Sequence, residues 1–183
     1  MRPGAGGAAA TLPGAGRAVA VRALAPHEWP LYRALRLRAL AQAPEAFAST
    51  LAEEEARGDH DWAWRLALGA TSGRELPLVA EAGGAGAGLA WAKADAADPS
   101  LARLYQLWVA PEARGHGVGA ALLAAALDWA RARNALAMEL GVVCGNDAAR
   151  RLYARAGFRE AGEPQPQRPG ANRMEQPMRL ALA

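Results

Sequence analysis

The stretch that decides the fold is Leu104-Tyr105-Gln106-Leu107-Trp108-Val109-Ala110-Pro111-Glu112-Ala113-Arg114-Gly115-His116-Gly117-Val118-Gly119, and a long apolar helix follows it. Its first half is apolar and aromatic, which predicts a buried strand that ends at Pro111. The glycines that follow allow a sharp backbone turn. Apolar residues recur at helical spacing from Val118 through Leu122 to Trp129, so a helix begins inside the turn. Its first N–H groups lack partners, which makes the turn a candidate phosphate site.

Length and composition indicate one folded unit. The chain has 183 residues, a formal net charge of +3 and a single cysteine, Cys144. Basic residues are mixed with acidic ones, so nucleic acid is not an expected partner. One cysteine excludes an internal disulfide and is typical of a reducing compartment, and no apolar run approaches the roughly 20 residues of a membrane helix. We therefore expect a cytoplasmic protein without a membrane partner, in which Cys144 is a small buried apolar residue.

The order of predicted elements defines the fold class. Residues 1–18 are rich in Gly, Ala and Pro and are expected to form a disordered tail, which leaves residues 19–183 as the folded domain. The expected elements are a strand at 19–24, a helix at 26–43, a helix from Leu51 capped by Ser49 or Thr50, hairpin strands at 78–81 and 89–93, the strand and helix described above, a strand at 137–143, a helix at 146–157 and a strand at 178–182. This order predicts an α/β domain of the α+β type, with a mixed sheet and helices on both faces.

Two phosphate-binding motifs can be compared with the glycine turn. A Walker-type loop requires Lys-Ser/Thr after its glycines, and none follows here, so this alternative fails. Gly115-x-Gly117-x-x-Ala120 does fit the dinucleotide fingerprint, and Glu139 follows about 20 residues later. Fewer than 70 residues remain after Gly119, however, which is too few for the rest of a doubly wound nucleotide domain. A dinucleotide-binding domain therefore stays open only as an unfavoured alternative.

Two motifs in order resemble those of a known family. Arg114-Gly115-His116-Gly117-Val118-Gly119 resembles the R/Q-x-x-G-x-G/A signature of the GNAT N-acetyltransferases. Downstream, Asn146-x-x-Ala149-x-x-x-Tyr153-x-x-x-Gly157-Phe158 resembles the second motif of the family at a matching separation. Upstream, Arg36–Leu40 and Pro44–Phe47 resemble the opening helix of many members. The resemblance extends from about Val19 to Leu182 and implies a central, splayed, mostly antiparallel sheet flanked by helices on both faces.

The resemblance also implies a cofactor and the residues that bind it. Acetyl-CoA would be the donor and CoA a product, with the diphosphate on the backbone N–H groups of the glycine turn. The implied cofactor-binding residues are Trp108, Val109, Arg114, Gly115, His116, Gly117, Val118, Gly119, Ala120 and Asn146. The Val109 N–H would hold the developing oxyanion, and Tyr153 matches the general acid of the family, which protonates the leaving thiolate. Glu81 is a candidate base, directly or through water, but no general base is assigned.

Together these features predict an acyltransferase that moves an acetyl group from acetyl-CoA to a primary amine by direct attack. The acids Glu53, Glu54, Glu55 and Asp59 favour a small cationic amine over a protein N-terminus or lysine. The alternative from another class is a module that binds acyl-CoA without catalysis. His27 and His60 have no ligand spacing to a second His or to Cys, so no metal is expected. A homodimer is plausible by family analogy.

Overall fold

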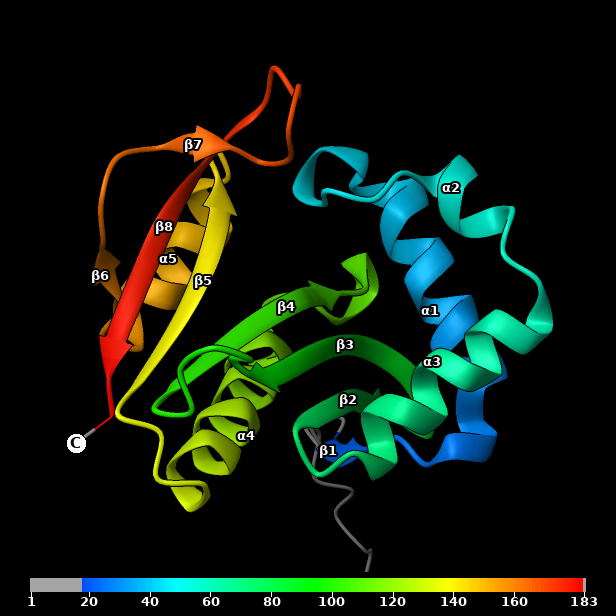
Figure 1. The fold of residues 1–183 in the computed structure, drawn as a ribbon. Coiled ribbons are helices and arrows are strands. Elements are labelled where there is room, and N and C mark those ends of the chain that lie inside the picture. The colour runs from blue at the N-terminus through cyan, green and yellow to red at the C-terminus, as the bar shows by residue number, and fades with distance from the viewer. Residues whose placement is uncertain (1–17, 183) are drawn as a thin grey trace, which may run out of the picture.

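One mixed sheet runs through the molecule, whose computed structural model describes residues 18–182 (Figure 1). Its strands are β1 (Val19–Ala23), β2 (Glu75–Ala82), β3 (Ala85–Ala94), β4 (Leu101–Val109), β5 (Ala137–Val143), β6 (Arg159–Glu160), β7 (Gln165–Pro166) and β8 (Met174–Ala181). The strand order is β1-β2-β3-β4-β5-β8-β6, and β7 also pairs with β8. Every pair is antiparallel except β4 with β5. The fold class expected from the sequence is therefore confirmed, while the tail expected at residues 1–18 falls almost wholly outside the described residues.

Helices cover both faces of this sheet. They are α1 (Trp29–Gln42), α2 (Leu51–Glu55), α3 (Asp59–Thr71), α4 (Val118–Ala132) and α5 (Asp147–Arg155), with 3-10 turns η1 (Pro26–Glu28), η2 (Pro44–Ala46) and η3 (Pro111–Ala113). α1 and α3 pack on one face, where Trp91 of β3 meets Tyr32 edge to face at a centroid distance of 5.1 Å. α4 packs on the other face, and Figure 1 shows α5 behind β5 and β8.

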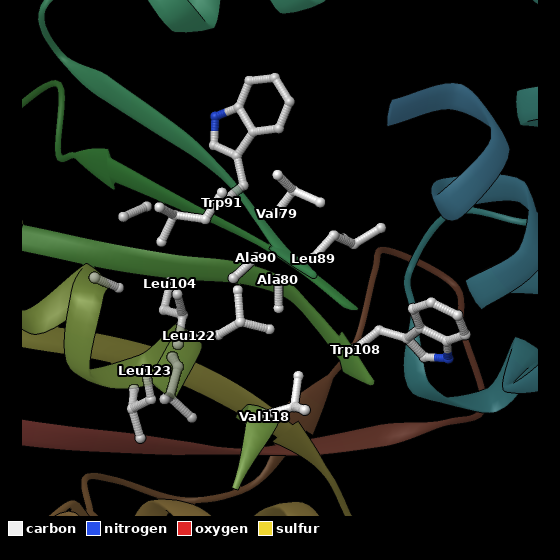
Figure 2. Close-up of a cluster of buried hydrophobic side chains, with 14 of the residues drawn as sticks. Val79, Ala80, Leu89, Ala90, Trp91, Leu104, Trp108, Val118, Leu122 and Leu123 are labelled. Carbon is white, nitrogen blue, oxygen red and sulfur yellow. The ribbon is translucent and has the colours of Figure 1, made fainter. Parts of the chain in front are cut away.

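The core lies on both sides of the central strands. Figure 2 shows Trp91 on one side of the strands and Leu122 and Leu123 of α4 on the other. All three side chains are at most 2% exposed. Because the sheet is buried on both faces here, the middle of β2 (78–80) and of β3 (87–92) is continuously apolar, without the alternation of a half-exposed strand.

Several local predictions are confirmed and others need correction. Thr50 caps α2, since its hydroxyl accepts from the Glu53 N–H at 3.2 Å. The single helix expected from Leu51 is in fact two helices. The first, α2, ends at Glu55, and Gly58 is the N-cap of the second, α3. The last strand begins at Met174, four residues earlier than expected, and runs through Pro177. Pro177 has no N–H to donate, but it lies just past the last β8 residue that pairs with the short strand β6, and its carbonyl still accepts from the Ala161 N–H at 2.9 Å.

The parallel pair β4–β5 separates after a short contact. Three residues of β4, from Leu101 to Arg103, pair with Ala137 to Glu139 of β5, and the pairing ends there. A bulge then bends β4, because two residues stand between Tyr105 and Trp108 while one stands between their partners on β3. Gln106 lies in this bulge with φ 58°. The ends of β4 and β5 consequently diverge, which is the splay that the family resemblance implied.

No helix in the described part of the chain combines the length and apolarity required to cross a membrane.

Candidate functional site

A cleft of about 810 Å³ lies between the diverging ends of β4 and β5. The glycine turn before α4, the start of α5 and the segment from Gln42 to Phe47 complete its walls. Nine of the ten residues expected to bind the cofactor border this cleft: Trp108, Val109, Arg114, Gly115, Gly117, Val118, Gly119, Ala120 and Asn146. The cleft is therefore the candidate functional site.

The glycine turn presents unpaired backbone donors to the cleft. Gly115 and Gly117 have φ of 78° and 80°, in the left-handed region that side chains rarely adopt. Gly117 is the N-cap of α4, and no side chain caps the helix there. The N–H groups of Val118, Gly119 and Ala120 come before the first intrahelical hydrogen bond, which the Ala121 N–H donates to Gly117 O at 2.9 Å. This arrangement suits an anion such as a diphosphate.

The backbone of β4 also offers a donor to the gap. The Ala110 N–H donates to Ala87 O of β3 at 2.9 Å. Because successive N–H groups of a strand point to opposite edges, the Val109 N–H points away from β3 and toward the gap. The Val109 carbonyl accepts a hydrogen bond from Arg114 Nε at 3.1 Å. A free amide at this position can polarise a carbonyl group placed in the cleft.

Trp108 forms part of the cleft wall and is only 4% exposed. Its indole Nε1 is buried and has no hydrogen-bond partner within the described residues. The Arg38 guanidinium lies 5.6 Å from the indole ring and also binds Glu112 of η3, with Nη2 2.7 Å from Oε2. Arg38 therefore connects α1 to the start of the glycine turn, a role that the sequence did not indicate.

Asn146 both caps a helix and borders the cleft. Its Oδ1 accepts a hydrogen bond from the Ala149 N–H at 3.2 Å, as expected for the N-cap of α5. Its place in the lining is compatible with the second role expected of it, contact with the cofactor.

Tyr153 lies behind the cleft wall. Its side chain is 6% exposed, and its ring packs 5.9 Å from that of Phe158. The neighbouring Leu152 and Ala149 line the cleft, whereas Tyr153 is not part of the lining. Burial raises the pKa of the Tyr153 phenol above its ordinary value of 10, so the hydroxyl carries its proton at neutral pH.

Two other residues lie differently from what the sequence suggested. The His116 ring borders a separate hollow of about 290 Å³ beside β1, and its Nδ1 lies 2.8 Å from Arg114 O. We therefore expect only the backbone of His116, and not its ring, to contact a ligand in the cleft. The expectation that Cys144 is buried is wrong, because Cys144 follows the last residue of β5 and lies exposed at the cleft.

The acidic residues that favoured a cationic acceptor are mostly paired with arginines. Glu54 is buried, and its Oε2 lies 2.9 Å from Arg57 Nε and 3.1 Å from Arg65 Nη1. Glu53 binds Arg168, and Asp59 binds Arg33, each at 3.3 Å. Glu81, the candidate base, binds Arg22 at 2.7 Å on β2. None of these carboxylates borders the cleft, so they give no reason to prefer a cationic acceptor.

The bulge that shapes the cleft was not predicted. Gln106 has a left-handed backbone without being glycine, and its Oε1 accepts a hydrogen bond from the Tyr32 hydroxyl at 3.0 Å. No local signal in the sequence marks this position, because the bulge follows from pairing between β3 and β4.

A further hollow of about 470 Å³ beneath the end of α4 contains none of the expected site residues. Within residues 18–182, no group of three or more His, Cys, Asp or Glu side chains is arranged to hold a metal ion.

Comparison with known proteins agrees with the geometry of the cleft. A family model described as the acetyltransferase (GNAT) family matches residues 33–158. The chain therefore belongs to the acetyltransferase (GNAT) family.

Relatives with names or structures extend this comparison. A mycothiol acetyltransferase of Clavibacter sepedonicus is 38% identical over 128 residues, which make up 70% of this chain and 38% of the relative. The chain thus spans well under half of that relative. An acetyltransferase structure from Salmonella typhimurium with its cofactor acetyl-CoA is similar at TM-score 0.72 and 20% identity, covering 90% of this chain and 94% of that one. A ribosomal-protein-alanine N-acetyltransferase from Brucella melitensis is similar at TM-score 0.70 and 27% identity, covering 89% and 99%.

Proposed function

We propose that this chain transfers an acetyl group from acetyl-CoA to a primary amine by direct attack within the cleft between β4 and β5. The observation that carries the proposal is the position of the glycine turn, whose unpaired amides border the same cleft as the free edge of β4. Acetyl-CoA is the acyl donor that the family uses, and it supplies an acetyl group activated as a thioester.

The residues of the cleft fit such a donor. The N–H groups from Gly117 to Ala120 would hold the diphosphate, and Arg114 would add positive charge beside it. Asn146 would contact the pantetheine arm. Trp108 and Val109 would pair with the arm along the edge of β4, and the Val109 N–H would stabilise the negative charge that develops on the thioester oxygen.

Tyr153 is proposed as the general acid. Its protonated hydroxyl would give a proton to the sulfur as the C–S bond breaks. Because the ring lies behind Leu152 and Ala149, the hydroxyl would reach the sulfur through the gap between the strands, on the side where α5 packs.

The acceptor is proposed as a primary amine, either of a small molecule or of a protein N-terminus or lysine. The names of the relatives point to different acceptors, because one is a mycothiol acetyltransferase and another a ribosomal-protein-alanine N-acetyltransferase. The acids near α2 are paired with arginines, so the proposal assigns no charge to the acceptor.

Release of free thiol from acetyl-CoA tests this function. The amines would be spermidine, a peptide with a free N-terminal alanine, a peptide with an internal lysine and desacetyl-mycothiol. We expect thiol release that depends on one of these amines, with the acetylated amine detected by mass spectrometry. A module that only binds acyl-CoA would release no thiol with any of them, which would refute the proposal.

A thermal-shift titration distinguishes the dinucleotide alternative. A ligand at one hundred times its Kd stabilises the protein by about 2.7 kcal/mol, which raises the Tm of a chain this size by roughly 5–10 °C. We expect this shift with acetyl-CoA and CoA and none with NAD. Stabilisation by NAD alone would favour the dinucleotide-binding domain.

A further inference from the structure

One carboxylate lies directly over Gly141 of β5, two residues before Val143, which lines the cleft. A Cβ built on Gly141 of β5 would lie 2.6 Å from Cδ of Glu175 and 2.7 Å from each of its carboxylate oxygens. Glu175 belongs to β8 and pairs directly with Val143. The carboxylate thus fills the space that a side chain at position 141 would occupy.

The strand pairing identifies the face of the sheet to which this carboxylate belongs. Trp91 packs against Tyr32 on the face covered by α1 and α3, and Tyr105 stands directly opposite Trp91 on β4. Arg103 lies two residues before Tyr105, so it shares this face. Its Nη1 lies 3.1 Å from Oε2 of Glu139 on β5, which places Glu139 on the same face.

Because successive side chains of a strand point to opposite faces, every second residue of β5 after Glu139 lies on the same face as Glu139. Gly141 and Val143 follow Glu139 at intervals of two residues. Glu175 shares the face of Val143 because directly paired residues of antiparallel strands project to the same side. Val143, which pairs with Glu175, lines the cleft. Arg173, two residues before Glu175 in the chain, lines it as well. Glu175 is not itself part of the cleft lining, but it lies next to Val143 and Arg173, which are, on the face opposite α5.

The charged groups around Glu175 are engaged elsewhere. Arg103 and Arg179 both bind Glu139, at 3.1 and 2.6 Å, and Arg173 Nη1 donates to Pro44 O at 3.4 Å. On β7, the residue paired with Glu175 is Gln165, which is uncharged. On β4, the nearby titratable group is Tyr105. The pKa of its phenol is raised chiefly by burial and in part by the charge of Glu175. Partial burial raises the pKa of Glu175 itself, and no cation among residues 18–182 opposes this effect.

We propose that Glu175 is the general base that removes a proton from the acceptor amine. This inference rests on the proposed function and adds the base that the sequence did not supply. The acceptor enters from the face of the sheet shared by Tyr105 and Glu175, while Tyr153 acts from the α5 side. Glu45 also borders the cleft, but it is exposed to solvent on η2, whereas Glu175 is partly buried.

The proton transfers balance. The ammonium form of the acceptor gives one proton to the Glu175 carboxylate, and the nitrogen lone pair then forms the C–N bond to the acetyl carbon. The C–S bond breaks with its electron pair on sulfur, which takes the proton of the Tyr153 hydroxyl. The nitrogen returns its second proton to the Tyr153 phenolate through water, and Glu175 releases its proton to solvent. The products are an amide, a thiol and one proton.

The test compares Glu175→Gln with wild type, using acetyl-CoA and spermidine or the alanyl peptide, whichever wild type acetylates. A general base contributes roughly 10²–10⁴-fold, so we expect kcat at pH 7 to fall about 100-fold or more. The ratio of wild type to variant should shrink toward tenfold or less at pH 9.5, because the free amine then forms without help. The Kd for acetyl-CoA, measured by calorimetry, should not change.

Three further measurements separate catalysis from structure. Gly141→Ala should displace the carboxylate without straining the backbone, and lower kcat several-fold with the same acetyl-CoA Kd. Glu139→Gln, on the same face but paired with Arg103 and Arg179, should keep kcat within about twofold. Carbon-13 NMR of labelled glutamate, assigned by its loss in Glu175→Gln, should give a carboxyl pKa above the ordinary 4.5.

The outcomes are distinct. A loss of kcat in Glu175→Gln that is the same at every pH, or no loss, overturns the inference while the proposed function stands. The inference is also overturned, and the proposed function stands, if Glu45→Gln rather than Glu175→Gln shows the pH-dependent loss of kcat. If wild type releases no thiol with any amine, the proposed function itself fails and this inference fails with it.

Discussion

At the scale of single residues, the proposed reaction depends on a proton donor and on a backbone amide that come from different parts of the chain. Tyr153 is almost fully buried against Phe158, and burial keeps its phenol protonated. The Val109 N–H is directed to the gap because its neighbour Ala110 is bonded to β3. Tyr153 belongs to α5 and the Val109 N–H to β4, so their effects on turnover can be measured separately.

Tyr153→Phe removes only the hydroxyl. We expect kcat to fall about 100-fold, within the usual range for loss of a general acid, because the sulfur then leaves without a proton. The Kd for acetyl-CoA should stay within about twofold, since the ring and its packing on Phe158 remain. Steady-state kinetics with calorimetry check this result. Unchanged turnover would remove Tyr153 from the mechanism.

At the scale of elements, the site arises where a glycine turn joins β4 to α4. Gly117 gives the turn its left-handed backbone and serves as the uncapped N-terminus of α4. The divergence of β4 and β5 supplies the space, and the bulge at Gln106 bends β4 on one side of it. In the proposed function the turn would hold the diphosphate and the gap would accept the extended arm, so both would be needed to bind the cofactor.

Gly117→Ala tests the turn. Its φ of 80° costs an L-residue roughly 1–2 kcal/mol, so the alanine variant should lose about 1 kcal/mol of unfolding free energy. Because the turn must change to relieve this strain, acetyl-CoA affinity should fall about tenfold or more.

Gly84→Ala is the matched control for that variant. Gly84 also has φ 80°, has open space around its Cβ position and lies in the turn between β2 and β3. The Gly84→Ala variant should lose a similar free energy of unfolding, measured in urea, and should bind acetyl-CoA as tightly as wild type. Equal affinity losses in both variants would show that the turn at Gly117 has no special part in binding.

At the scale of the whole molecule, ion pairs hold the helices to the sheet. Arg22 of β1 binds Glu28 of η1 at 2.8 Å and Glu81 of β2 at 2.7 Å. The hydrogen bonds from Arg22 and from the Ala25 N–H lower the pKa of Glu28 from 4.5 to about 2. A lowered pKa means that the folded state favours the carboxylate.

The stability contributed by Glu28 should therefore depend on pH. This contribution is fully present above pH 4.5, which is the pKa of Glu28 in the unfolded chain. It is lost as the pH falls toward about 2, the pKa in the folded state. In urea unfolding, Glu28→Gln should be less stable than wild type at pH 7, and the difference should narrow at pH 3. A difference that stays constant between pH 7 and pH 3 would contradict this assignment.

Features that depend on neighbouring residues in the chain could be predicted from the sequence. Thr50, one of the two residues expected to cap the helix from Leu51, does cap it, and the helix expected to begin inside the glycine turn starts at Val118. Both depend on contacts within a few residues.

Features that depend on distant contacts could not be predicted. The bulge at Gln106 follows from pairing with β3, and the early start of β8 at Met174 follows from pairing with β5 and β7. The position of Glu175 over Gly141 combines residues 34 positions apart, so no local pattern indicates it. The exposure of Cys144 likewise depends on where β5 ends at the cleft.

A crystal structure with acetyl-CoA bound is the most direct test of the central claim. The account predicts diphosphate oxygens within about 3.2 Å of the backbone nitrogens from Gly117 to Ala120, and the thioester oxygen at the Val109 N–H. Acetyl-CoA bound away from the gap between β4 and β5, or with its diphosphate remote from the glycine turn, would contradict it.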